Sequence, residues 1–229
     1  MRLISLNLWR GEQESEVREF LENNLEQTDV FCFQEAQGVE ALLNEILSKH
    51  GFSIKEGVKN AFERYKLRTY VRKNIEVTSV NTIGTDIYDG GVGLMTELMT
   101  DDGPLVTVNV HGVSRPGDKL DNPARIKLSE EIVEFLRNKQ NIPQIICGDF
   151  NLLPFTKSVA ILEDNGYGNL IKEYRISTTR NELAWDRFPG NKQLFADYTF
   201  VSGDVEVRDF KVPNVSISDH LPMILDFVT

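Results

Sequence analysis

Apolar positions along the chain follow two periods, and together they predict an order of strands and helices. A short apolar run, Leu3–Leu8, precedes a helical pattern, and a second run, Val30–Phe33, precedes another. The second helical pattern ends near Gly51. The helical positions are Val17, Phe20, Leu21 and Leu25, and then Val39, Leu42, Leu43, Ile46 and Leu47.

After residue 51 the helical period disappears, and strand-like runs take its place at Leu67–Val71, Ile75–Ile83, Val92–Thr100 and Leu105–Val110. The turn Asp101-Asp102-Gly103 joins the last two as a hairpin. A third helix is predicted over Ile126–Leu136, with Pro123 near its start. The remaining elements are a strand at Gln144–Cys147, a short helix at Val159–Leu162, and strands at Tyr198–Val201, Val205–Val212 and Met223–Val228.

This order predicts an α/β protein of the α+β type. The chain shows no linker, low-complexity tract or repeat, so we expect one domain over residues 1–229. Hydrophobic residues make up 41% and charged residues 26%, which allows a sizeable core. Apolar runs stay far below the roughly 20 residues of a membrane span, and Met1 to Leu8 lacks a secretory layout. Cys32 and Cys147 lie inside apolar runs, which favours reduced core thiols and a cytoplasmic location.

The net charge of −10 argues against a strongly basic face for long nucleic acids. It does not exclude a nuclease, because carboxylates that hold a divalent cation make a chain look more negative than the working enzyme. Charge therefore lowers the odds of tight polyanion binding and leaves the substrate open.

Polar side chains stand where the predicted strands end or begin. Each alone has an ordinary explanation, such as a helix cap, a turn or a surface position. Strand ends and the starts of antiparallel neighbours share one edge of a sheet, so the joint pattern predicts a cleft where they converge. The residues are Asn7, Glu35, His111, Asp149, Asn151, Asp197, Asp219 and His220.

This inventory fits a hard divalent cation. With two cysteines and three histidines, a sulfur- or histidine-rich zinc site has no support, whereas carboxylate and amide oxygens suit Mg²⁺ or Mn²⁺. Such an ion neutralises charge on a phosphoryl group during transfer. A histidine beside an aspartate is held in one tautomer, with a raised pKa. No P-loop, G-x-G-x-x-G or H-E-x-x-H motif occurs. The inventory therefore suits a metal-dependent phosphoesterase, and nucleotide-triphosphatase, dinucleotide-enzyme and zincin functions lack support.

In their order, these residues resemble the endonuclease/exonuclease/phosphatase superfamily. The resemblance extends from residue 7 to residue 222, and the ordered set is specific where single tripeptides are not. It implies two packed mixed β-sheets flanked by helices. The matching segments are Leu6-Asn7-Leu8-Trp9, Phe33-Gln34-Glu35, Val110-His111, Gly148-Asp149-Phe150-Asn151, Ala196-Asp197-Tyr198 and Ser218-Asp219-His220-Leu221-Pro222.

The resemblance also implies roles. Glu35 is the chief ligand of Mg²⁺ or Mn²⁺, with Asn7 and Asp219 nearby. Members of the superfamily differ in which of two residues acts as the base, so that choice stays open. The remaining roles are water positioning or deprotonation by Asp149, a phosphate contact from Asn151, phosphate contact or base catalysis by His220, orientation of that ring by Asp197, and stabilisation of the phosphate or leaving oxygen by His111.

One departure concerns Trp9, which stands where apurinic-site enzymes carry an acidic residue. It argues against a second metal ligand there and against abasic-site repair. The stretch Thr178–Asn191 contains Arg180, Asn181, Trp185 and Arg187, of which the first three are the candidate substrate-binding residues, and a plain surface loop is an equal alternative.

The predicted partner is a phosphate-ester substrate: a nucleic acid, a small nucleotide-like ester, or a phosphorylated lipid or inositol headgroup. Negative charge and the lack of a membrane segment favour a small or single-stranded substrate over duplex DNA or a membrane lipid. We expect neither stable membrane insertion nor an obligate protein partner. The alternative is a non-catalytic phosphate-binding module that retains the fold, which the intact set of polar positions disfavours.

Overall fold

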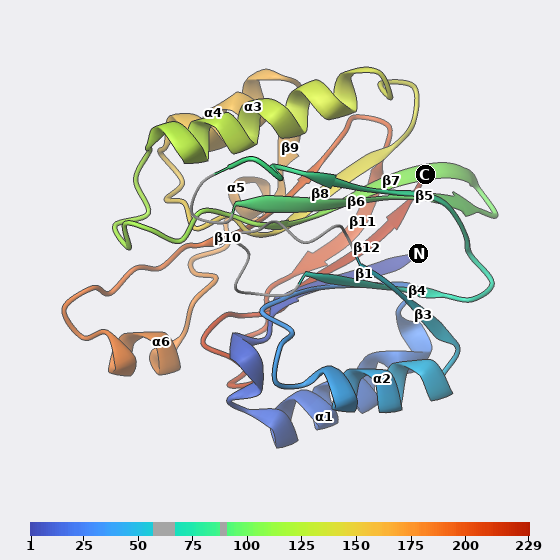
Figure 1. The fold of residues 1–229 in the computed structure, drawn as a ribbon, viewed down its shortest axis with the longest axis horizontal. Coiled ribbons are helices and arrows are strands. Elements are labelled where there is room, and N and C mark those ends of the chain that lie inside the picture. Colours follow the sequence, from blue (N-terminus) through green and yellow to red (C-terminus); the bar gives the residue numbers. More distant parts are fainter. Residues whose placement is uncertain (57–66, 88–90) are drawn as a thin grey trace.

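Two six-stranded β-sheets form the centre of the structure, a computed structural model that describes residues 1–56, 67–87 and 91–229. The first sheet has the strand order β11-β12-β1-β2-β4-β3, and the second has β5-β6-β7-β8-β10-β9. The sheets pack face to face, with helices on both outer sides (Figure 1). One core cluster joins them and includes Leu3 and Cys32 from the first sheet and Val108 and Cys147 from the second.

Helices cover the outer face of the first sheet because their apolar residues recur on one side. Val17 and Leu21 of α1 and Leu43 of α2 pack in one cluster with Ile4 and Phe31 of the sheet. The elements of this half are β1 (Arg2–Asn7), a 3₁₀ turn η1 (Trp9–Gly11), α1 (Glu14–Asn24), η2 (Leu25–Gln27), β2 (Val30–Gln34), α2 (Glu40–Lys49), β3 (Phe52–Lys55), β4 (Arg68–Arg72), β11 (Glu206–Lys211) and β12 (Met223–Val228).

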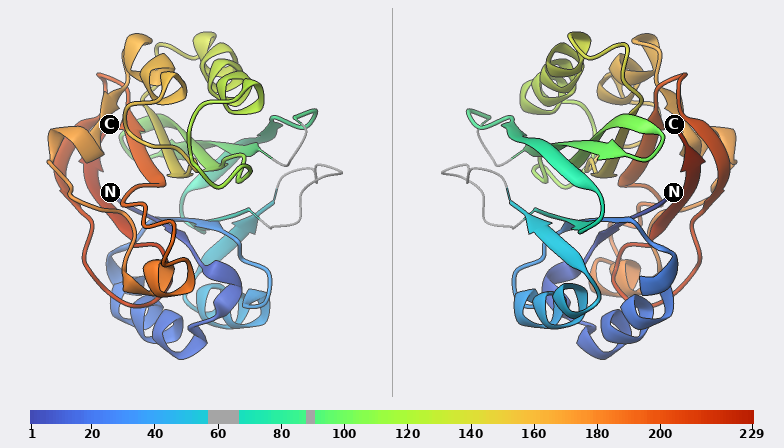
Figure 2. Two further views of the ribbon diagram at one scale, coloured as in Figure 1. Left: turned by 90° about the vertical axis from the view of Figure 1, so that its left-hand side faces the viewer. Right: turned by 90° about the vertical axis from the view of Figure 1, so that its right-hand side faces the viewer.

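Helices α3 and α4 cover the second sheet, so the layers are stacked in the order helix, sheet, sheet, helix (Figure 2). Asn122 caps α3 by accepting a hydrogen bond from the Arg125 backbone, and Pro123 begins the helix as predicted. The elements of this half are β5 (Glu76–Ile83), β6 (Val92–Thr100), β7 (Gly103–His111), α3 (Pro123–Arg137), β8 (Gln144–Asp149), α4 (Lys157–Asp164), β9 (Gly168–Asn169), α5 (Leu170–Glu173), α6 (Glu182–Arg187) and β10 (Asp197–Val201).

Each sheet contains one parallel pair among antiparallel neighbours. β1 runs parallel to β2, and β7 runs parallel to β8. Strand β12 is antiparallel to β1, and β10 is antiparallel to β8. The ends of the parallel strands and the starts of β10 and β12 therefore lie at one edge of the sandwich. The predicted fold of two packed mixed sheets is confirmed.

The structure adds elements that the pattern does not predict. Strand β3 has only Phe52 buried, so its apolar signal is weak. Helix α6 lies inside the stretch Thr178–Asn191, which as a whole is therefore not a plain loop. Strand β8 continues two residues beyond the predicted Cys147. It does so through Gly148, where φ is +136° and an added Cβ would lie 2.1 Å from the Val110 carbonyl oxygen, so only glycine fits.

Both cysteines are free and buried, as predicted for core thiols. Their environment also raises the pKa of Cys32, through contact with Cys147 and through burial. Among the described helices, none is both long and apolar enough to cross a membrane.

Candidate active site

The polar residues at the strand ends come together at one edge of the sandwich. In the second sheet, Asp149 is in register with His111 on one side and with Asp197 on the other. From the first sheet, the Asn7 Nδ2 atom donates a hydrogen bond of 3.0 Å to Asp149 Oδ2. The two sheets therefore meet at Asp149, where the sequence predicts a cleft.

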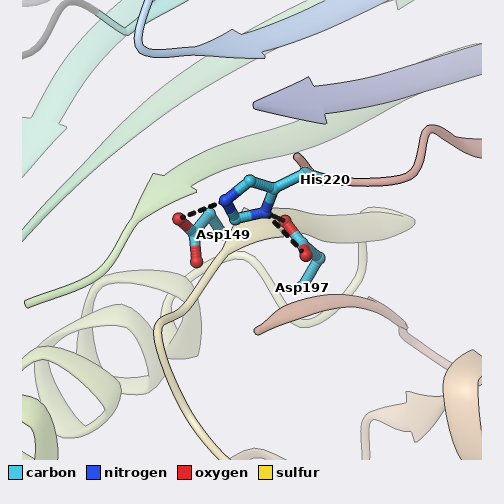
Figure 3. Close-up of side chains that lie close together, drawn as sticks. All are labelled: Asp149, Asp197 and His220. Atoms are coloured by element: carbon cyan, nitrogen blue, oxygen red, sulfur yellow. Dashed lines mark hydrogen bonds and ion pairs between the residues drawn. The ribbon is translucent and has the colours of Figure 1, made fainter. Parts of the chain in front are cut away.

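The segment before β12 brings His220 to this edge. The Ser218 hydroxyl donates to the Asn7 carbonyl oxygen at 2.7 Å and so fastens the segment to β1. The Nδ1 atom of His220 lies 2.8 and 2.9 Å from the two oxygens of Asp197 (Figure 3). Its Nε2 atom lies 3.7 Å from Asp149 Oδ2. The predicted contact between Asp197 and His220 is present.

Arg180 occupies the other side of the His220 ring. It forms an isolated β-bridge with His220, its Nη2 donates to Asp219 at 2.7 Å, and its Nη1 lies 2.5 Å from His220 Nε2. Because Nδ1 donates to Asp197, the contact with a guanidinium fits a ring whose Nε2 carries no proton. Thr179 fixes this segment by accepting hydrogen bonds from the backbone of Ala196 and Asp197.

Burial and charge set the titration of the site. Burial and Arg180 lower the pKa of His220, but the carboxylates of Asp197, Asp149 and Asp219 outweigh them and raise it. Burial raises the pKa of Asp197. For Asp149, burial opposes ionisation, yet positive neighbours, His220 foremost and then Lys119, hold the pKa down to about 2. Asp149 is therefore ionised at neutral pH.

Glu35 and His111 lie beside this group. The Nε2 atom of His111 is 3.8 Å from Glu35 Oε1 and 3.9 Å from Asp149 Oδ2. Glu35 follows β2 directly with a φ of +49°, and Arg10 lies 3.6 Å from its other oxygen. The sequence prediction therefore places Glu35 and His111 correctly at the edge shared by both sheets.

The oxygens at this edge fit a hard divalent cation. The buried Asp219 Oδ1 atom accepts no hydrogen bond from any residue that the structure describes. Asp219 and Glu35 line one cavity of about 290 Å³. Asn7 Oδ1 accepts one hydrogen bond, from the Trp9 backbone, which leaves it a second lone pair. Carboxylate and amide oxygens of this kind are the ligands that Mg²⁺ takes.

A second geometric possibility for a metal is less favourable. Asp149, Asp197 and His220 each offer an atom, and these atoms lie within 4.8 Å of one another. The Nδ1 atom of His220 is already hydrogen-bonded to Asp197, and Nε2 faces Arg180, so the imidazole has no nitrogen left for a metal. This triad is better suited to holding a proton.

The three candidate substrate-binding residues have different environments. Arg180 and Trp185 line the cavity, and the Trp185 ring lies under Lys192 at 4.2 Å. Asn181 is bonded to the backbone instead. It accepts a hydrogen bond from Leu183 at the start of α6 and donates one of 2.7 Å to the Ser218 carbonyl oxygen. Its position is that of a cap that ties α6 to the segment carrying His220.

Sequence reasoning missed Lys119, which also lines the cavity. Its Nζ atom donates to Asn151 Oδ1 at 2.6 Å. Asn151 in turn donates to Asp149 from its backbone at 2.9 Å and from its side chain at 3.2 Å. No pattern marks this lysine, because lysines are usually solvated and this one follows an irregular segment, Val113–Asp118.

The sandwich of two packed mixed sheets with flanking helices defines a deoxyribonuclease-like fold. The chain belongs to the Endonuclease/Exonuclease/phosphatase family, whose sequence profile matches residues 4–220. Members of this family are phosphoric ester hydrolases and generally depend on divalent metals. No protein among those curated for function matches the chain in sequence.

Solved structures share the fold at low sequence identity. The human Nocturnin catalytic domain, solved with a bound sulfate anion, is 18% identical with a TM-score of 0.77, over 100% of this chain and 93% of that one. A humanised zebrafish (Danio rerio) TDP2 is 16% identical with a TM-score of 0.77, over 100% and 99%. A mannosyl-6-phosphatase of Bacteroides thetaiotaomicron is 16% identical with a TM-score of 0.72, over the full length of both chains.

Proposed function

We propose that this protein is a Mg²⁺- or Mn²⁺-dependent phosphoesterase that hydrolyses a phosphodiester or a phosphomonoester. One observation carries the proposal: a buried His220, held by Asp197, lies 3.7 Å from Asp149 at a cavity that Glu35 and Asp219 also line. Burial of ionisable groups is costly, so packing alone does not explain why four carboxylates and an imidazole are buried or half-buried at one edge of the sandwich.

Glu35, Asn7 and Asp219 are the residues that would hold the cation. The support is the set of oxygen donors and the buried Asp219 Oδ1 atom, which lacks a hydrogen bond from the described residues. When bound, such an ion neutralises charge that develops on the phosphoryl and leaving oxygens.

Asp149 and His220 divide the handling of the attacking water. Asp149 is ionised, and its oxygens accept hydrogen bonds from Asn7 and Asn151, so it is fixed in place as an acceptor that orients the water. His220 has Nδ1 fixed by Asp197, which leaves Nε2 as the atom that exchanges a proton. We therefore favour His220 as the group that moves the proton and Asp149 as the group that positions the water.

Phosphate contacts come from donors around the same cavity. Asn151 and His111 would stabilise non-bridging or leaving oxygens, and Arg180 would add a guanidinium that suits phosphate geometry. In the structure Arg180 contacts His220 Nε2, so a phosphate that draws Arg180 toward itself would also release that nitrogen. Substrate binding and activation of His220 are then coupled.

The substrate class remains nucleic acid, nucleotide or phosphorylated headgroup, with a small or single-stranded ester favoured by the net charge. The two buried, free cysteines support a cytoplasmic location. The alternative, a phosphate-binding module without catalysis, predicts binding of the same anions with no turnover.

A turnover panel tests the proposal. Phosphomonoesters, phosphodiesters, single-stranded RNA and DNA, and plasmid DNA are incubated with Mg²⁺, with Mn²⁺ and with excess EDTA. We expect hydrolysis of at least one ester that EDTA abolishes and that His220→Ala reduces by about 10²–10⁴-fold. Turnover that persists in EDTA would reject the metal, and phosphate binding without turnover of any ester would favour the binding module.

A further inference from the structure

Lys119 is a buried cation with few partners. Its side chain lines the cavity, and the residue is only 8% exposed. An ammonium group has three N–H donors, and within the described part of the chain one is used, in the bond to Asn151, with no ion pair to a carboxylate. A buried charge without a paired carboxylate is costly. The free donors therefore point to an anion that belongs in the cavity.

The backbone around Lys119 is held from three directions. Arg125 of α3, itself buried, donates to the carbonyl oxygen of Val113 at 2.9 Å and to the Asp118 carboxylate at 3.0 Å. The same guanidinium also bonds the backbone oxygens of Pro116 and Leu120. After β8, the Leu153 backbone donates to the Lys119 carbonyl oxygen at 2.9 Å, and before β10, Gln193 donates to the Asp118 carbonyl oxygen at 2.9 Å.

This support keeps Lys119 in a left-handed conformation with a φ of +58°. Residues other than glycine adopt that region at a cost, and they persist there where the surroundings fix them. A lysine that served only to fill space would have no need of such a conformation. The segment is thus built to direct an ammonium group at the cavity.

The charges in the cavity indicate what the ammonium binds. Arg180 is paired with Asp219, and the His220 imidazole is hydrogen-bonded to Asp197, so each of these groups already has a carboxylate partner. Among the described residues that line the site, Lys119 is the buried cation without an ion pair, whereas Arg187 is exposed and lies over the Trp9 ring. A phosphodiester carries one negative charge, whereas a terminal phosphate carries about two at pH 7 because its second pKa is near 6. The additional charge of a monoester is what an additional cation matches.

We infer that Lys119 contacts a terminal oxygen of the scissile phosphate and makes a phosphomonoester the preferred substrate, an inference that rests on the proposed phosphoesterase function. Asn151 links the ammonium group to Asp149, so the lysine lies one hydrogen-bonded residue from the group proposed to position water. Burial lowers the pKa of Lys119, and an anion bound beside the ammonium group would raise it again.

The test compares Lys119→Met and Lys119→Arg with wild type on a monoester, p-nitrophenyl phosphate, and a diester, bis-p-nitrophenyl phosphate, in Mg²⁺ or Mn²⁺ at pH 7.5. Lys127→Met is the matched control, because Lys127 is a half-exposed α3 residue that pairs with Asp86 and Glu131. We expect Lys119→Met to lower kcat/KM for the monoester by about 10²-fold and for the diester by less than about 10-fold. Lys119→Arg should retain more of the monoester activity, and the control should behave as wild type.

Isothermal titration calorimetry with inorganic phosphate gives a readout without turnover. Wild type should bind phosphate, and Lys119→Met should bind it at least about 10-fold more weakly. Equal losses on both esters, an unchanged ratio of monoester to diester activity, or a wild type that hydrolyses the diester alone would overturn the inference. If Lys119→Met does not fold, the same comparison with Lys119→Arg and the wild-type phosphate titration decide it.

The two proposals fail separately. A wild type that binds phosphate through Lys119 but hydrolyses neither ester would reject the proposed function and retain the anion site. A wild type that hydrolyses both esters, with the same ratio in Lys119→Met, would retain the proposed function and reject the role of Lys119.

Discussion

Asp197→Asn tests whether the carboxylate beside His220 acts through its charge. Both residues are buried, and the His220 Nδ1 atom lies within 2.9 Å of both Asp197 oxygens. Asparagine keeps the size of the side chain and an oxygen that accepts the Nδ1 hydrogen, but it removes the negative charge. We therefore expect the fold to survive and the chemistry to fail.

The size of the effect follows from the contact. A hydrogen bond to a charged group contributes about 1.5–3 kcal/mol, and the carboxylate of Asp197 raises the pKa of His220, so removing its charge should lower that pKa. The loss of kcat should be about 10²–10⁴-fold, as for other proton-transfer groups.

The effect on stability has a defined sign. The carboxylates around His220 raise its pKa in the folded protein. The stabilisation that these carboxylates give is therefore fully present below about pH 6.5, the pKa of a histidine in the unfolded chain. It is lost as the pH rises through the higher pKa of His220 in the folded protein. Asp197→Asn should therefore be less stable than wild type mainly at pH values below the folded pKa of His220. At higher pH the free energies of unfolding of wild type and variant should converge.

NMR titration of the three histidines, assigned by replacing His50, His111 and His220 in turn, measures the shift, and urea denaturation at several pH values measures the stability. Asp209→Asn on β11 is a control with the same change of charge, at an edge strand of the first sheet. If the His220 titration does not move in Asp197→Asn, the contact has no electrostatic role and the proposed proton transfer is wrong.

Three further predictions concern the metal, acid stability and the α6 cap. Glu35→Gln should weaken Mg²⁺ binding at least about 10-fold by calorimetry, and unchanged affinity would remove Glu35 from the ligands. The pKa of Asp149 is about 2 in the folded protein, whereas an aspartate in the unfolded chain has a pKa of about 3.9. Ionised Asp149 therefore stabilises the fold above about pH 3.9, and this stabilisation is lost as the pH falls toward 2. Asp149→Asn should therefore show a flatter loss of stability between those pH values, and a slope equal to wild type would contradict the shift. Asn181→Ala should cost about 1–3 kcal/mol of stability, because it removes the α6 cap and the bond to Ser218, with kcat changed less than about 3-fold. A large loss of kcat at unchanged stability would instead assign Asn181 to the substrate.

The convergence of the site was predictable because strand ends have a fixed geometry. His111 ends β7 and Asp149 ends β8, and a parallel pair necessarily places its last residues side by side. Asp197 begins an antiparallel neighbour and so joins them. Residue type and position in an element were sufficient there, since the backbone ladder itself sets the distances.

The contributions of irregular segments were not predictable. Arg180 reaches His220 through an isolated bridge, and Asn181 turns to the backbone as a cap, although the two are neighbours in sequence. Their directions depend on how Thr179 is bonded to the start of β10, a long-range contact with no periodic signal. The same limit applies to Lys119, whose segment is organised by a buried arginine on another element.

Backbone strain supplies an independent argument for the same edge. A left-handed residue other than glycine costs about 1–2 kcal/mol, although asparagine tolerates the region better than most. Among the described residues, six residues other than glycine have a positive φ. Five of them line the cavity: Trp9, Arg10, Glu35, Lys119 and Asn151. Stability alone would not concentrate strain at one place, whereas fixing donors and charges around a ligand would. The strain marks Glu35 and Asn151, which the sequence motifs also mark, and it marks Lys119, which no motif does. The left-handed backbone conformation and the buried, unpaired ammonium group thus both indicate Lys119. This agreement is the reason to test Lys119 before the more exposed cations that line the cavity.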